Sequence, residues 1–132
     1  MSDPLTGVWC AALTPMHDDL SVDPAAMVAH HQWLLGNGCD GVAVLGTTGE
    51  ANSFAIAERL AVIEAAANSG IARQRLLIGT GCCAAPDTVA LTRAALDAGF
   101  DQILMLPPFY YKGVGDDGLF APINTSRGCP YN

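Results

Sequence analysis

Basic residues, long apolar runs and metal-binding motifs are all scarce in this sequence, and each scarcity argues against a class of function. Six Lys and Arg stand against thirteen Asp and Glu among 132 residues, with no basic cluster, which disfavours nucleic acid and anionic membranes as partners. No apolar run approaches the roughly 20 residues of a membrane span, and the residues around Asp3 lack the pattern of a secretory signal. We therefore expect a cytoplasmic protein with no nucleic acid or membrane partner.

The cysteines and histidines form no recognisable metal or redox motif. The sequence has five cysteines, an odd number, and no C-x-x-C pair, whereas zinc and dithiol sites depend on such spacing. His30 and His31 are adjacent, so on a helix they would point to different sides. We expect reduced cysteines, no metal, and surface or half-buried histidines.

What the sequence does have is enough apolar residues for a folded core. Hydrophobic residues make up 51% of the chain and charged residues 14%, which favours a globular interior over disorder. Apolar runs predict strands at residues 8–13, 41–45, 75–79 and 102–106.

Three amphipathic segments separate these strands. Asp23 and Pro24 supply a cap and a first-turn proline for a helix that ends at residues 36–38, and Ser53 is expected to cap a second helix through Asn68. Pro86 opens a third helix, which ends before residue 99. The side chains expected to face the core are Trp33, Ile56, Leu60, Ile63, Ala67, Val89, Leu91, Ala94, Ala95 and Ala98. Apolar strands alternating with such helices predict an α/β fold with a parallel sheet.

The turn after the second strand carries the clearest chemical signal. Gly46-Thr47-Thr48-Gly49-Glu50 directly follows the apolar run at residues 41–45. Its glycines allow the backbone to expose N–H groups, and its threonines add two hydroxyl donors. This combination favours binding of a small carboxylate without a cation.

Two α/β architectures fit this alternation. Gly79-Thr80-Gly81-Cys82-Cys83-Ala84 matches the G-x-G-x-x-A pattern of a dinucleotide-binding fold. The alternative is a (β/α)₈ barrel, in which functional residues gather at the carboxyl ends of the strands. All four predicted strands end in polar or glycine-rich turns, as the barrel requires.

Four motifs in order resemble the dihydrodipicolinate synthase/N-acetylneuraminate lyase family. They are Thr14-Pro15, the Gly46–Glu50 turn, Gly79-Thr80-Gly81 and Pro107-Pro108-Phe109-Tyr110-Tyr111, and the resemblance covers about residues 5 to 120. It implies the N-terminal half of a (β/α)₈ TIM barrel, about three and a half βα units, from a homotetrameric class I aldolase. Such enzymes form a Schiff base between a lysine and pyruvate or another 2-oxo acid, with no metal or organic cofactor.

The resemblance also assigns roles to individual residues. It implies that Thr48 and Thr47 bind the pyruvate carboxylate, and that Thr47 and Tyr110 form a proton relay, with Tyr110 contributed across a subunit contact. We interpret Gly46, Gly49, Glu50 and Thr14 as structural residues near the site.

The sequence also departs from this family. Lys112 is its single lysine and follows the fourth strand, whereas the resemblance places the imine-forming lysine in strand six. Residues 1–121 correspond to a partial barrel, while residues 122–132 lack an apolar period and are expected to be an irregular, non-family tail. We expect a truncated or frame-shifted form that is inactive alone. The alternative function is an inactive half-barrel that acts only by association.

Overall fold

The protein folds into a four-stranded parallel sheet with three helices, as a computed structural model shows for residues 5–107 and 109. The strands are β1 (Trp9–Ala11), β2 (Gly41–Val44), β3 (Leu76–Gly79) and β4 (Ile103–Leu104). The helices are α1 (Pro24–Gly36), α2 (Ile56–Ala67) and α3 (Ala85–Asp97), and two 3₁₀ turns are η1 (Ala51–Ser53) and η2 (Arg73–Arg75). The predicted α/β class and its alternating strands and helices are confirmed.

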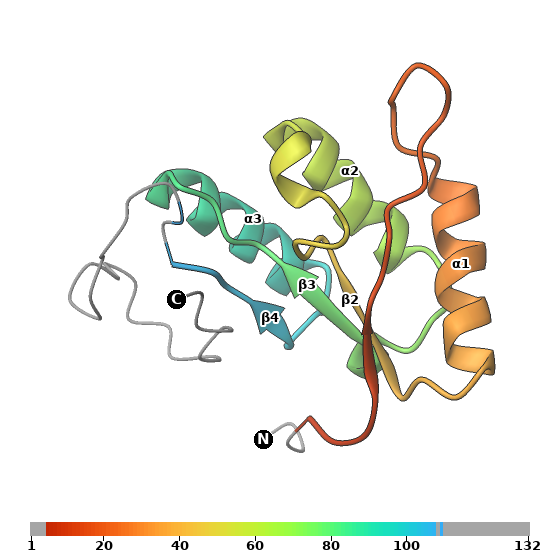
Figure 1. Ribbon diagram of the computed structural model, residues 1–132. Helices are drawn as coiled ribbons and strands as arrows, with labels where there is room; N and C mark the ends of the chain where they lie inside the picture. The colour runs from red at the N-terminus through yellow and green to blue at the C-terminus, as the bar shows by residue number, and fades with distance from the viewer. Residues whose placement is uncertain (1–4, 108, 110–132) are drawn as a thin grey trace.

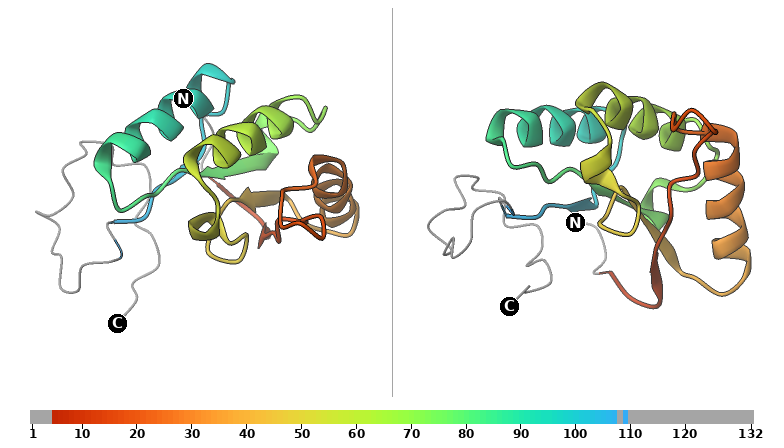
Figure 2. Two further views of the ribbon diagram at one scale, coloured as in Figure 1. Left: turned by 90° about the horizontal axis from the view of Figure 1, so that it is seen from above. Right: turned by 45° about the horizontal axis from the view of Figure 1, so that its top comes forward.

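The strands lie in the order β1-β2-β3-β4, and every neighbouring pair is parallel. Successive right-handed crossovers place all three helices on the same face of the sheet (Figures 1 and 2). This is the arrangement of the N-terminal half of a (β/α)₈ barrel. A dinucleotide-binding fold has the strand order 3-2-1-4, with its fourth strand beside the first. Here β4 lies beside β3, so that alternative interpretation is wrong.

The core lies between the sheet and its helices. β2 and β3 contribute Val42, Val44, Leu76 and Ile78, all at most 2% exposed. Helices and loops add Met27, Leu91 and Phe100, which are fully buried. A continuous core of this kind fixes the strands in register, with Val44 opposite Ile78 and Ile78 opposite Ile103.

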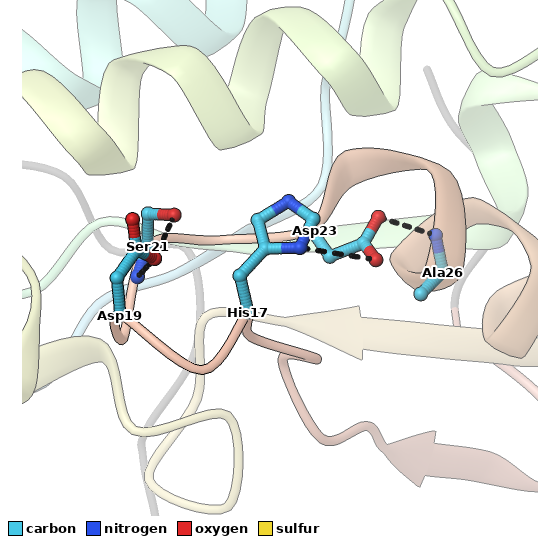
Figure 3. A network of polar contacts seen from close by, with 5 residues as sticks. All are labelled: His17, Asp19, Ser21, Asp23 and Ala26. Atoms are coloured by element: carbon cyan, nitrogen blue, oxygen red, sulfur yellow. Dashed lines mark hydrogen bonds and ion pairs between the residues drawn. The ribbon is translucent and has the colours of Figure 1, made fainter.

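α1 begins where the sequence predicts. The Asp23 carboxylate accepts a hydrogen bond from the Ala26 N–H at 2.9 Å, and Pro24 occupies the first turn. His17 lies 3.7 Å from the same carboxylate. Figure 3 shows this network beside Asp19, whose carboxylate accepts hydrogen bonds from the Ser21 N–H and hydroxyl; these bonds lower the pKa of Asp19.

The start of α2 differs from the prediction. Ser53 lies in η1 and does not cap the helix; the cap position is Ala55. The Glu58 carboxylate, one turn into the helix, accepts a hydrogen bond from the Ala55 N–H at 2.7 Å. The backbone of residues 51–54 closes its own 3₁₀ turn, with the Phe54 N–H donating to the Ala51 carbonyl, so the helix starts later.

Three side chains expected to face the core are exposed instead. Trp33 is 62% exposed, Val89 48% and Leu60 37%. On α2 the buried face is formed by Arg59, Val62, Ile63 and Ala66, which places Leu60 beside that face and not on it. Thr88 and Thr92 are buried on α3, so polar residues occupy positions that an apolar pattern alone does not predict.

Candidate active site

The carboxyl ends of β2, β3 and β4 surround a pocket. It is small, with about 10 Å³ of enclosed space, and it is partly open to solvent. The residues that line it are Leu45, Gly46, Thr47, Ala51, Asn52, Gly79, Gly81, Leu104 and Leu106. None of these side chains is charged, so a ligand here would meet hydroxyl, amide and apolar groups.

The turn after β2 is fixed by two residues in the left-handed backbone region. Leu45 has φ 58° and is 2% exposed, and Glu50 has φ 54°; side-chain-bearing residues adopt this region at a cost of about 1–3 kcal/mol. The Glu50 N–H donates to the Thr47 carbonyl at 3.1 Å, and the Ala51 N–H donates to the Gly46 carbonyl at 3.3 Å. The strained positions thus begin and end a compact turn that contains both threonines.

Residues that follow β1 hold this turn from behind. The Thr14 hydroxyl is buried and donates to the Gly49 carbonyl at 2.7 Å. A Cβ atom at Gly49 would lie 3.0 Å from the Ala12 carbonyl oxygen and 3.1 Å from the Thr14 hydroxyl oxygen, so only glycine fits without displacement. These contacts support the structural roles that we assign to Thr14 and Gly49.

Thr47 and Thr48 remain available as donors. Both are exposed, and Thr47 lines the pocket whereas Thr48 does not. Within residues 5–107 and 109, the N–H groups of both threonines have no hydrogen-bond acceptor. The turn therefore offers two hydroxyls and two backbone N–H groups, the donor set expected for a carboxylate. Glu50 is exposed and contributes to the turn through its backbone.

A buried arginine that the sequence analysis missed lies behind the end of β3. Arg59 is 2% exposed, and its guanidinium donates to the Gly79 carbonyl at 3.0 Å and to the Gly81 carbonyl at 3.1 Å. One of its terminal nitrogens also lies 3.0 Å from the Cys82 sulfur. Its spacing to Val62, Ile63 and Ala66 is the signal that could have found it, because residues three, four and seven apart share a helix face.

His31 is also more buried than expected. It is 1% exposed, and neither of its ring nitrogens has a partner in the described part of the chain. Burial, together with the neighbouring His30, lowers the pKa of His31 to about 4. The expectation of a surface or half-buried role is wrong for this residue, which is a neutral core side chain at pH 7.

The cysteines that the structure describes carry free thiols. They are Cys10, Cys39, Cys82 and Cys83. Burial, and then the adjacent Cys39, raises the pKa of Cys10. Across residues 5–107 and 109, no cluster of three metal-ligating side chains occurs and no helix is long and apolar enough to span a bilayer.

Part of the predicted site thus comes together, and part falls outside the described residues. The structure brings the Gly46–Glu50 turn beside the ends of β3 and β4 and supports it with Thr14. Tyr110, Lys112 and the predicted tail at residues 122–132 lie outside the described residues.

Comparison with known proteins agrees with this arrangement. Residues 4–119 match the Dihydrodipicolinate synthetase family. A DapA-like lyase from Chloroflexus aurantiacus is 42% identical over 92% of the chain and 40% of its own length. The crystal structure of dihydrodipicolinate synthase from Agrobacterium tumefaciens superposes with a TM-score of 0.79 at 42% identity, over 86% of this chain and 40% of that one.

A second similar solved structure contains a bound ligand. YagE from E. coli K12, a prophage protein of the dihydrodipicolinic acid synthase family, was crystallised in complex with pyruvate. It is 32% identical, with a TM-score of 0.81, over 89% of this chain and 39% of that one. The chain thus spans about 40% of the length of the relatives that it matches.

Proposed function

The chain belongs to the dihydrodipicolinate synthetase family, and we propose that it supplies the carboxylate-binding half of a lyase that acts on pyruvate or a related 2-oxo acid. The reaction would be an aldol condensation or cleavage through a lysine Schiff base. The observation that carries this proposal is the uncharged pocket at the strand ends, beside a turn whose hydroxyl and N–H donors have no acceptor among the residues that the structure describes.

The roles of the threonines follow from this donor set. Thr48 and Thr47 bind the substrate carboxylate through their hydroxyls, while Thr47 also passes a proton to Tyr110. A phenol suits such a relay because it can transfer a proton without a permanent charge beside the imine. Thr47 is the threonine that lines the pocket, which supports its double role.

The imine itself needs a lysine that this sequence does not carry in the expected place. Lys112 is the only lysine, and it follows β4 in the chain. In the proposed reaction the Schiff base therefore forms on a lysine outside these 132 residues. We further propose a cytoplasmic location and a homo-oligomeric assembly for the complete enzyme, with no metal or cofactor.

Association without catalysis is the second candidate function. Val8 and Leu13, which flank β1, are 62% and 57% exposed, and no strand pairs with the outer edge of β1 or β4 in the described part of the sheet. Unpaired edges and exposed apolar side chains favour pairing with another chain. An inactive half-barrel would use these surfaces to bind a second copy or another polypeptide.

Pyruvate titration tests the proposed function. In ¹⁵N NMR spectra of the 132-residue chain, pyruvate should shift the amide signals of Thr47 and Thr48 first. Thr48→Val removes one donor to a charged group, worth about 1.5–3 kcal/mol, so the affinity should fall by roughly 10- to 150-fold. Thr6→Val is the matched control, because Thr6 is an exposed threonine that precedes β1 and lies at the amino end of the sheet. Equal affinities in both variants would refute the proposal.

A further inference from the structure

Arg59 is a buried cation without a carboxylate partner in the described residues. The ion pair found there joins His17 and Asp23, far from α2 in the sequence, and the Arg59 guanidinium bonds to two backbone carbonyls and a sulfur. Its Nε atom is buried, with no partner in the part of the chain that the structure describes. Burying a charge in this way is unfavourable, and apolar residues of similar volume often serve a core as well or better. The position is therefore poorly explained by stability alone.

The atoms that Arg59 holds belong to the pocket wall. Gly79 and Gly81 both line the pocket, and the guanidinium binds the carbonyls of both. One planar group thus fixes two peptide units that are separated by a single residue, because its donors have a rigid spacing.

The same loop is held on its other sides by close backbone contacts. The Thr80 N–H donates to the Leu104 carbonyl at 3.0 Å. A Cβ atom at Gly81 would lie 2.7 Å from the Leu106 backbone nitrogen. The Cys82 N–H donates to the Thr88 hydroxyl at 3.0 Å. Arg59 provides the contact from the α2 side, so its loss would free the wall on that side only.

We propose that Arg59 is a positioning residue of the site, which holds the loop after β3 in place through the Gly79 and Gly81 carbonyls and so sets the wall of the pocket near Thr47. Its contribution to ligand binding rests on the proposed function, whereas its contribution to loop order does not. Arg59 is 2% exposed and its terminal nitrogens bind the Gly79 and Gly81 carbonyls and the Cys82 sulfur, so it acts through the loop and not by touching the ligand.

The chain offers a matched control for this role. Arg75 also donates to two backbone carbonyls, those of Asp40 at 2.9 Å and Cys39 at 2.8 Å. It lies in η2, just before β3, and its carbonyl partners precede β2. Its contacts are therefore at the amino end of the sheet, opposite the pocket. Arg59→Met removes hydrogen bonds to backbone carbonyls at the carboxyl end of the sheet, and Arg75→Met removes the same kind of bonds at the amino end.

Hydrogen exchange of the 132-residue chain measures loop order directly. In Arg59→Met, exchange of the Thr80 and Cys82 amides should rise about tenfold or more, while that of β2 changes little. Arg75→Met should speed exchange near residues 39–41 and leave residues 79–82 as in the wild type. Arg59→Lys keeps a charge but lacks the planar fork, so its exchange rates at Thr80 and Cys82 should lie between those of Arg59→Met and the wild type. If Arg59→Met does not fold, the exchange rates of Arg59→Lys decide whether Arg59 holds the loop. Unchanged exchange at Thr80 and Cys82 in the folded Arg59 variants would overturn the proposal.

Pyruvate affinity measures the consequence for the site. Arg59→Met should weaken pyruvate binding about tenfold, whereas Arg75→Met should weaken it by less than about twofold. The unfolding midpoint of Arg59→Met in urea should stay unchanged. Equal weakening in both variants, or loosening of the loop without any loss of affinity, would also overturn the positioning role. If the wild type binds no pyruvate, the proposed function fails, and the exchange data still decide whether Arg59 holds the pocket wall.

Discussion

Gly79→Ala should separate the ends of β2 and β3. A Cβ atom built on Gly79 would overlap the carbonyl group of Leu45, far inside the 3.0 Å that real Cβ atoms keep. The obstructing atoms belong to the backbone, so no side chain can rotate away. The two strands must move apart by roughly 1 Å, and overpacking of this kind costs about 1–3 kcal/mol.

The net effect is smaller than the strain because alanine also restricts the unfolded chain. That restriction stabilises the protein by about 0.4–1 kcal/mol, which leaves a net loss for Gly79→Ala centred on about 1.3 kcal/mol and at most about 2.6 kcal/mol. Gly46→Ala is the control within the same pocket: its Cβ would lie 3.8 Å from a Leu104 methyl carbon, an ordinary contact. It should be neutral or slightly stabilising.

Urea unfolding followed by circular dichroism compares the two variants. It should be run at several protein concentrations, since association would shift the midpoint. A lower midpoint for Gly79→Ala and an unchanged one for Gly46→Ala are expected. If both variants unfold at the wild-type midpoint, the close approach between Leu45 and Gly79 does not exist in solution and the description of the pocket fails.

Three further predictions concern pH, the relay and association. Because the folded state keeps His31 neutral down to about pH 4 while the unfolded ring protonates below about 6.5, stability should fall between these values by up to about 3 kcal/mol. His31→Leu should remove that dependence in urea titrations at pH 7 and 4.5, and an unaltered pH dependence would argue against a neutral buried ring. In a complete enzyme containing this chain, Tyr110→Phe should lower turnover about 10²–10⁴-fold with a smaller effect on imine formation; unchanged turnover would make Tyr111 the next candidate. The isolated chain should self-associate through its open strand edges, whereas a compact monomer in sedimentation velocity would contradict this.

Local signals in the sequence predicted much of the fold. Asp23 and Pro24 fixed the start of α1, because a cap and a first-turn proline act within a few residues. The apolar runs likewise predicted all four strands, each somewhat longer than observed.

Features that depend on distant residues were predicted less well. Arg59 is buried because the carbonyls of Gly79 and Gly81 receive it, and those partners are 20 and 22 residues away. Trp33 is exposed although it is large and apolar, since burial depends on what packs against α1. The strained backbone at Leu45 is invisible in the sequence, because a leucine gives no sign of a positive φ.

For the candidate site, the motif after β2 identified the turn and its donors but not the rest of the pocket. Ala51, Asn52 and Leu104 line the pocket without any chemical signature of their own. They are brought there by the parallel sheet, which places successive strand ends at one edge. The assignment of Tyr110 as the relay residue stays a prediction.

Borohydride trapping with pyruvate, followed by intact mass measurement, tests the central claim most directly. The claim is that this chain binds the carboxylate of a 2-oxo acid but holds no lysine at the imine position. The account predicts no stoichiometric reduced adduct on the 132-residue chain, and an adduct only on a lysine supplied by a polypeptide that completes the barrel. A stoichiometric adduct on the chain alone that survives Lys112→Ala, and that peptide mapping does not place on the N-terminal amine, would contradict it.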